Sequence, residues 1–125
     1  MSEKNKFLIE VQPRYLADQS KPSDHKYAFA YTIKITNIGE TAAKLLSRHW
    51  LITDSNGKIE EVRGEGVIGK KPYLKPGEDF TYTSGALIAT AVGVMEGKYV
   101  MLSDTGENFD TPIPQFTLSI PRTLH

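Results

Sequence analysis

Six consecutive residues carry three glycines at the spacing that dinucleotide-binding proteins use to hold a pyrophosphate. They run from Gly64 to Gly69 and read G-E-G-V-I-G, which matches the pattern G-x-G-x-x-G. That pattern binds pyrophosphate when the glycines join a strand to a helix, because the N–H groups at the start of the helix face the phosphates. Here Lys70-Lys71-Pro72 follows directly and Pro76-Gly77 comes soon after, so no helix can begin there and continue. We therefore expect no binding of NAD or NADP through this segment.

A second interpretation of the segment is an anion site made by the backbone itself. Consecutive N–H groups in a glycine-rich turn can form a nest for phosphate, and flanking cations strengthen it. The residues of this candidate loop for an anion or a partner are Arg63, Gly64, Gly66, Gly69, Lys70 and Lys71. Glycines in strand-rich proteins also mark bulges or close packing of chain segments, which needs no ligand. The sequence favours the structural interpretation and leaves the anion site open.

The single tryptophan has an arginine and a histidine beside it. Trp50 alternates with Leu46, Arg48 and Ile52, as expected of a buried residue on a central strand. Its alternative role is a surface platform on which a ligand stacks. Successive residues of a strand face opposite sides, so Arg48 shares the face of Trp50 and His49 points away.

Other residue types that could do chemistry are poorly spaced for it. His25, His49 and His125 are scattered, which does not fit a zinc site with three histidine ligands. Glu60 and Glu61 are neighbours on an expected strand, so they face opposite sides and cannot act as a pair. No serine lies in a nucleophile motif. We expect no catalytic residues, no metal ligands and no cofactor.

Composition narrows the class of protein. The chain has 125 residues, no cysteine, and 15 Lys and Arg against 15 Asp and Glu. This length suits one domain spanning residues 1–125, and the absence of cysteine fits a reducing compartment. A net charge of zero gives no general attraction to nucleic acid. No apolar run is long enough for a transmembrane helix or a signal peptide, so we expect a cytoplasmic protein without membrane insertion.

The pattern of apolar residues is that of strands. Residues 27–35 alternate strictly, with Tyr27, Phe29, Tyr31, Ile33 and Ile35 on one face. Further strands are expected at residues 7–11, 45–53, 80–83, 99–102 and 116–120.

Turn signals separate these strands. Asn56-Gly57 predicts a hairpin turn of type I′. Residues 85–94, rich in small side chains, predict a looser connection. Pro114 and Pro121 predict strand ends or an edge strand. Seven or eight short strands without helical periodicity predict an all-β, antiparallel β-sandwich, with a small barrel as the alternative.

Five blocks in order resemble the ApaG family over nearly the whole chain. They are residues 47–58 (SRHWLITDSNGK), 60–69 (EEVRGEGVIG), 82–85 (YTSG), 95–101 (MEGKYVM) and 113–118 (IPQFTL). The chain departs from the family where many members have Cys-Pro and a later Thr-Pro, since it has Ala86-Leu87 and Thr90-Ala91. A role for a thiol at this place is thereby put in doubt.

The resemblance implies an immunoglobulin-like or fibronectin type III-like sandwich. It also implies a family-level association with cobalt and magnesium efflux or resistance, and with genes for dinucleoside polyphosphate hydrolysis. Related domains in a eukaryotic F-box protein and a DNA polymerase delta-interacting protein look like protein-binding modules. The family has no established catalytic residues, so the resemblance assigns none to this chain.

These observations predict a non-enzymatic binding module. A protein partner is the leading ligand, and we expect its docking surface near Tyr73, Leu74 and residues 87–94, where apolar side chains or a free sheet edge would be exposed. The alternative is a binder of pyrophosphate or nucleoside polyphosphate through the glycine-rich loop.

Overall fold

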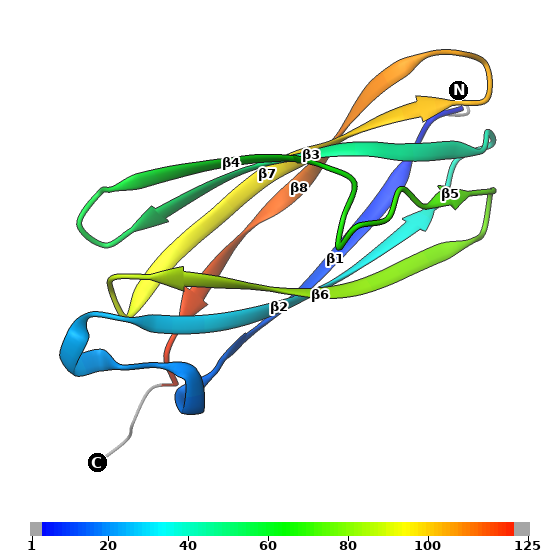
Figure 1. The fold of residues 1–125 in the computed structure, drawn as a ribbon. Coiled ribbons are helices and arrows are strands. Elements are labelled where there is room, and N and C mark those ends of the chain that lie inside the picture. The colour runs from blue at the N-terminus through cyan, green and yellow to red at the C-terminus, as the bar shows by residue number, and fades with distance from the viewer. Residues whose placement is uncertain (1–3, 122–125) are drawn as a thin grey trace.

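The computed structural model describes residues 4–121, which form two antiparallel sheets packed face to face (Figure 1). One sheet has the order β1-β2-β6 and the other β4-β3-β7-β8, with β5 paired to the start of β3. The strands are β1 (Phe7–Tyr15), β2 (Tyr27–Asn37), β3 (Ala43–Asp54), β4 (Ile59–Glu65), β5 (Tyr73–Leu74), β6 (Asp79–Ile88), β7 (Val92–Ser103) and β8 (Asn108–Ser119). Two short 3₁₀ helices, η1 (Ala17–Gln19) and η2 (Pro22–Asp24), lie between β1 and β2. The predicted all-β sandwich is confirmed.

The core lies between the two sheets and follows the predicted alternation. Phe29, Tyr31, Ile33 and Ile35 of β2 are all buried, as expected. Trp50 of β3 is 2% exposed and packs edge-on against Tyr31, with ring centroids 5.4 Å apart. The prediction that Trp50 is a core residue is therefore confirmed.

The predicted loose connection at residues 85–94 is wrong. β6 continues to Ile88 and β7 begins at Val92, so only residues 89–91 join them. The ladder with β2 runs without interruption from Thr36↔Asp79 to Tyr27↔Ile88. Small side chains predicted a loop, but pairing with a complete neighbouring strand outweighs their low strand propensity.

The hairpin predicted at Asn56-Gly57 is present between β3 and β4, but the turn is not of type I′. That type needs positive φ at both central residues, and here Gly57 has φ 82° whereas Asn56 is not left-handed. Asp54 organises the turn instead: its carbonyl accepts from the Gly57 N–H, and its carboxylate accepts from the N–H groups of Asn56 and Lys58. The hydrogen bonds of the Asp54 side chain therefore stabilise a turn in which Gly57 has positive φ and Asn56 does not.

Prolines lie in two strands at sheet edges. β8 contains Pro112 and Pro114, and β1 contains Pro13. Both strands have a neighbour on one side only, where a missing N–H costs no ladder bond. Pro114 therefore lies on an edge, as predicted, although β8 begins well before it. Within residues 4–121, no helix has the length and hydrophobicity needed to cross a lipid bilayer.

Candidate functional site

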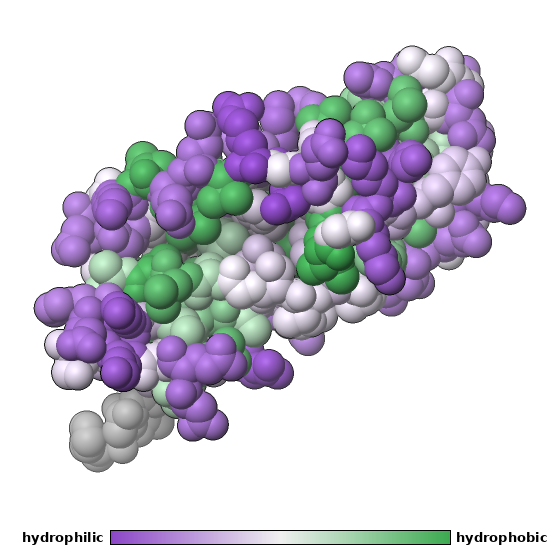
Figure 2. Space-filling view, in the orientation of Figure 1, coloured by the Kyte–Doolittle hydropathy of each residue, from purple (hydrophilic) through white to green (hydrophobic). Residues whose placement is uncertain are grey.

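One side of the sandwich is open. The edge strands β1 and β8 lie against each other, whereas the edge strands β4 and β6 are separated by three adjoining hollows, which we call the groove. The hollows share lining residues: Ile52, Glu60 and Leu87 join the first two, and Tyr31, Arg48 and Ser84 join the second to the third. Figure 2 shows apolar and pale residues gathered along this side between hydrophilic ones.

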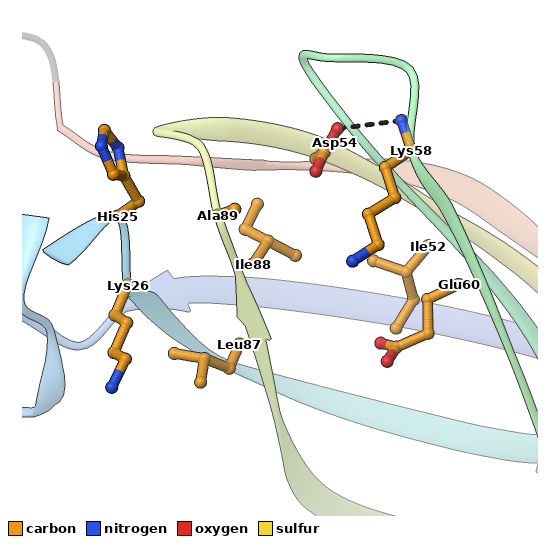
Figure 3. A pocket seen from close by; sticks show the side chains of 9 residues that line it. All are labelled: His25, Lys26, Ile52, Asp54, Lys58, Glu60, Leu87, Ile88 and Ala89. Atoms are coloured by element: carbon orange, nitrogen blue, oxygen red, sulfur yellow. Dashed lines mark hydrogen bonds between the residues drawn. The ribbon is translucent and has the colours of Figure 1, made fainter.

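One end of the groove is apolar with charges around it. Leu87 of β6, which is 57% exposed, lines the hollow at this end together with Ile52 of β3, and its side chain lies on the side of β6 toward Lys26 (Figure 3). Glu60 and Lys58 line it from the β3–β4 hairpin, and His25 and Lys26 from the segment before β2. An apolar side chain can therefore enter here between groups of both charges.

Arg48 lines the middle of the groove and its other end, and the backbone holds it in place. It pairs with Gly64 across the β3–β4 ladder, and a Cβ on Gly64 would lie 2.7 Å from the Cζ, Nη1 and Nη2 atoms of Arg48. Nη1 donates to the carbonyls of Glu65, at 3.0 Å, and Gly66, at 2.9 Å. Gly64 is thus required because the guanidinium occupies the space of a side chain.

The rest of the guanidinium has no partner in the part of the chain that the structure describes. Within residues 4–121, Arg48 forms no ion pair, and neither Nε nor Nη2 donates a hydrogen bond. The indole Nε1 of Trp50, which lines the same hollow, is buried and also lacks an acceptor among these residues. Two residues with unpaired donors, Arg48 and Trp50, therefore line one hollow.

Three tyrosines surround this part of the groove and the core beneath it. The hydroxyls of Tyr82 and Tyr99 are 2.5 Å apart and buried. Burial is the main reason that the pKa of each is raised well above its usual value. Burial also raises the pKa of Tyr31, against opposing effects of a hydrogen bond with Ser84 and the charge of Arg48. All three are neutral at physiological pH and cannot serve as counter-ions for Arg48.

The glycine segment forms a tight two-residue turn. Val67 and Lys70 exchange both backbone hydrogen bonds, and the residues between them are left-handed, with φ of 44° at Ile68 and 76° at Gly69. Gly66 has φ 60°, and a Cβ there would lie 2.2 Å from the Lys70 carbonyl oxygen. Gly64, Gly66 and Gly69 therefore each have a structural reason to be glycine.

Most N–H groups of this segment are used within the protein. Those of Gly66, Val67 and Lys70 donate to the carbonyls of Leu46, Lys70 and Val67. Two of the cations expected to attract an anion already form ion pairs: Arg63 with Glu61, and Lys71 with Glu65 at 3.5 Å. The anion site at Arg63, Gly64, Gly66, Gly69, Lys70 and Lys71 stays a prediction.

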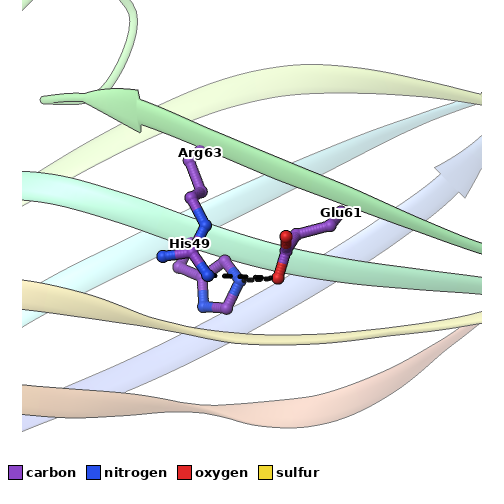
Figure 4. A network of polar contacts seen from close by, with 3 residues as sticks. All are labelled: His49, Glu61 and Arg63. Carbon is purple, nitrogen blue, oxygen red and sulfur yellow. Dashed lines mark hydrogen bonds and ion pairs between the residues drawn. The ribbon is translucent and has the colours of Figure 1, made fainter.

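A network of charges lies on the outer face of β3 and β4, away from the groove. The carboxylate of Glu61 contacts His49 Nε2 at 2.8 Å and Arg63 Nη2 at 3.2 Å (Figure 4). These two bonds hold the pKa of Glu61 below its usual value. The predictions that His49 points away from Trp50, and Glu61 away from Glu60, agree with this arrangement.

Metal ligands do not converge in the described part of the chain. Between residues 4 and 121, no group of three or more His, Asp or Glu side chains is placed to hold a metal ion. His25 and His49 lie in different places, at one end of the groove and on the outer face. His125 lies outside the described residues.

The structure alters the expected docking surface. Leu87 and Tyr73 are exposed, as predicted, but Leu74 is only 6% exposed and belongs to the core. The hydroxyl of Tyr73 donates to Asp104 at 2.6 Å. Of the predicted patch, Leu87, Ile88 and Ala89 line the groove, and Leu87 is the exposed large apolar residue among them.

Arg48 is the residue that the sequence did not single out for binding. Its shared face with Trp50 was predicted, and both line the same hollow. A further signal was available: a hairpin centred on Asn56 places Arg48 opposite Gly64, and a glycine opposite a long cation can mark a side chain lying across the strand.

Comparisons with known proteins agree on one family. The model of the ApaG domain matches residues 17–103. The chain is 54% identical to Protein ApaG of Dechloromonas aromatica (strain RCB) over 100% of both chains. It is 57% identical to Protein ApaG of Stenotrophomonas maltophilia (strain K279a), over 94% of this chain and 92% of the other. A crystal structure of a protein from Bordetella pertussis is similar, with TM-score 0.94 and 46% identity, covering 98% of this chain and 100% of that one.

Proposed function

Because this chain belongs to the ApaG domain family, we propose that it is a non-enzymatic module that binds a segment of a partner protein in the groove between β4 and β6. The observation that carries this proposal is the groove itself, where the exposed Leu87 and the half-buried Val62 and Ala86 lie between two sheet edges. Such a place suits an extended segment, which gains main-chain hydrogen bonds from an edge and buries alternate side chains.

The distribution of proline also favours the groove side of the molecule as the binding site. The edges that close the sandwich contain Pro13 in β1 and Pro112 and Pro114 in β8. The edges beside the groove, β4 and β6, contain none. Proline removes a donor and obstructs strand addition, so the groove edges are the ones suited to pair with another chain.

The proposed module acts in the cytoplasm and carries out no reaction of its own. The association with cobalt and magnesium efflux, which the family resemblance implies, is assigned in this proposal to the partner. In support of that assignment, no three His, Asp or Glu side chains among the described residues are placed to hold a metal ion.

The proposal is tested by finding a partner and then weakening its binding at the groove. The immobilised protein is used to capture partners, with and without nucleotides and divalent cations, and a captured protein is purified and titrated by calorimetry. Leu87→Glu places a charge in the apolar end of the groove and should weaken binding by roughly tenfold or more.

Leu8→Glu is the matched control, since Leu8 is 45% exposed but lies on β1, away from the groove. It should leave the affinity unchanged, and both variants should melt near the wild type because both leucines are exposed. Equal affinities of the two variants for the partner would contradict a binding site in the groove.

A further inference from the structure

Arg48 is a positioned cation without a counter-ion among residues 4–121. Its guanidinium lies against Gly64, and Nη1 is held by two backbone carbonyls. The edge formed by Nε and Nη2 makes no hydrogen bond within residues 4–121. This edge presents two donors in one plane, which is the geometry that the two oxygens of a carboxylate match. Because the side chain is already held, less conformational entropy is lost when a ligand binds.

The surroundings select among anions. Trp50 lines the same hollow and has a buried N–H without an acceptor among residues 4–121, and the nearby tyrosines are neutral. The carboxylates of Glu60 and Glu65 line the hollows on either side, although Lys71 pairs with Glu65. A group with several negative charges is repelled by these glutamates more than a single carboxylate is. Leu87 and Val62 line the middle hollow as well, so apolar atoms beside the carboxylate can be buried.

We infer that Arg48 binds a carboxylate of the partner segment, from an acidic side chain or a chain terminus, with the indole N–H of Trp50 as a second donor. This inference rests on the proposed function, because it names the chemistry that anchors the partner in the groove. It differs from the anion loop predicted from the sequence, since Arg63, Lys70 and Lys71 take no part in it.

The site can be tested on the isolated protein, without a partner. Trp50 is the only tryptophan, so its indole N–H gives one resonance in a ¹⁵N-labelled sample. N-acetyl-leucine carries one carboxylate beside an apolar side chain, and N-acetyl-leucinamide is its neutral equivalent. Titration with the acid should shift the Trp50 indole and Arg48 Nε resonances, and the amide should bind roughly tenfold more weakly or worse. Pyrophosphate, the third probe, should bind more weakly than the acid.

Variants separate the role of Arg48 from general charge. Arg48→Gln should abolish the response, and Arg48→Lys should lose most of it because an ammonium lacks the two-donor edge. Gly64→Ala should also weaken the response, since its methyl group displaces the guanidinium. Arg63→Gln, on the outer face, should respond like the wild type. If Arg48→Gln does not fold, Arg48→Lys and Gly64→Ala decide the matter.

Several results would overturn the inference: an unmoved indole resonance, an equal response to acid and amide, tighter binding of pyrophosphate, or a wild-type response in all folded Arg48 and Gly64 variants. These results are distinct from failure of the proposed function. If Leu87→Glu weakens partner binding but N-acetyl-leucine does not shift the Trp50 indole resonance, the proposed function stands and the carboxylate site is contradicted. If N-acetyl-leucine shifts the indole resonance but no partner binds Leu87→Glu more weakly than the wild type, the carboxylate site stands and the proposed function is contradicted.

Discussion

Three neighbouring residues, Gly66, Ile68 and Gly69, adopt left-handed backbone conformations for different reasons. Gly66 is constrained by space as well as by φ, because the Lys70 carbonyl oxygen lies where its Cβ would be. Gly69 has no atom within 4 Å of that position. Ile68 is β-branched and therefore disfavoured at positive φ, and its side chain is 52% exposed beside the groove. The two glycines are therefore explained by the backbone of the turn, whereas Ile68 is not, and its exposed place beside the groove suits a role in binding.

The two glycines give a prediction about stability. Gly69→Ala should destabilise by about 1 to 2 kcal/mol, the cost of a left-handed L-residue. Gly66→Ala meets the same cost and also forces the backbone apart, so its loss should be larger by about 2 kcal/mol. Urea denaturation of both variants checks this. Similar losses would show that the contact with Lys70 is relieved without strain.

Ile68 gives the opposite prediction. A β-branched residue is disfavoured at positive φ, whereas asparagine tolerates it, so Ile68→Asn should stabilise the protein by about 0.5 to 1 kcal/mol. If Ile68 contacts the partner, the same variant should bind it less tightly. Thermal unfolding and calorimetry measure the two effects. The control is Ile59→Asn in β4, an exposed isoleucine without positive φ, which should gain no stability.

At the scale of elements, β4 joins two environments. Its one face, through Glu60 and Val62, lines the groove, while Glu61 and Arg63 on the other face contact His49 of β3. The period of two along the strand makes this separation unavoidable. Charges that hold β4 to β3 can therefore be changed without touching the groove.

The pH dependence of stability tests this outer network. The pKa of Glu61 is lowered in the folded protein, mainly by its hydrogen bond with His49, so its contribution is present above the usual value of 4.5 and is lost as pH falls through the folded pKa. Glu61→Gln should be slightly less stable than the wild type at pH 7, and the difference should be smaller at pH 3. Urea denaturation at both values measures the difference. A difference that persists at low pH would exclude the ionised carboxylate as its source.

At the scale of the molecule, the sandwich is closed on one side and open on the other. Proline-containing edges meet on the closed side, and the groove runs along the open side. Beneath the groove the core holds a tyrosine pair, Tyr82 and Tyr99, one residue from each sheet. The hydrogen bond between them links the two sheets where the sandwich is open.

Alkaline pH should reveal this pair. The pKa of each hydroxyl is raised by folding, so the unfolded chain releases its protons first and stability falls as pH rises above about 10, by roughly 1.4 kcal/mol per pH unit for each group. Tyr82→Phe leaves Tyr99 without its partner and should cost about 1 kcal/mol at pH 7. Its stability should then fall less steeply with pH. Parallel curves for variant and wild type would contradict this.

The sequence by itself determined most of the strands, the sandwich and most of the core. Strict alternation places Phe29, Tyr31 and Ile33 on one face, and burial of apolar surface admits few other arrangements. It also separated Trp50 from His49, because the period of a strand is a local property.

Only the tertiary structure decided what happens at the groove. Ser84 and Leu87 of β6 line the same hollow as Arg48 of β3, although more than thirty residues separate them in the chain, and local patterns do not encode that distance. The turn at residues 67–70 is equally hidden, because isoleucine at positive φ contradicts its own propensity. The backbone carbonyls of Glu65 and Gly66, which hold Arg48, come into position only when that turn has formed. Strand pairing follows side-chain periodicity, whereas the site depends on contacts between segments that only the packed fold brings together.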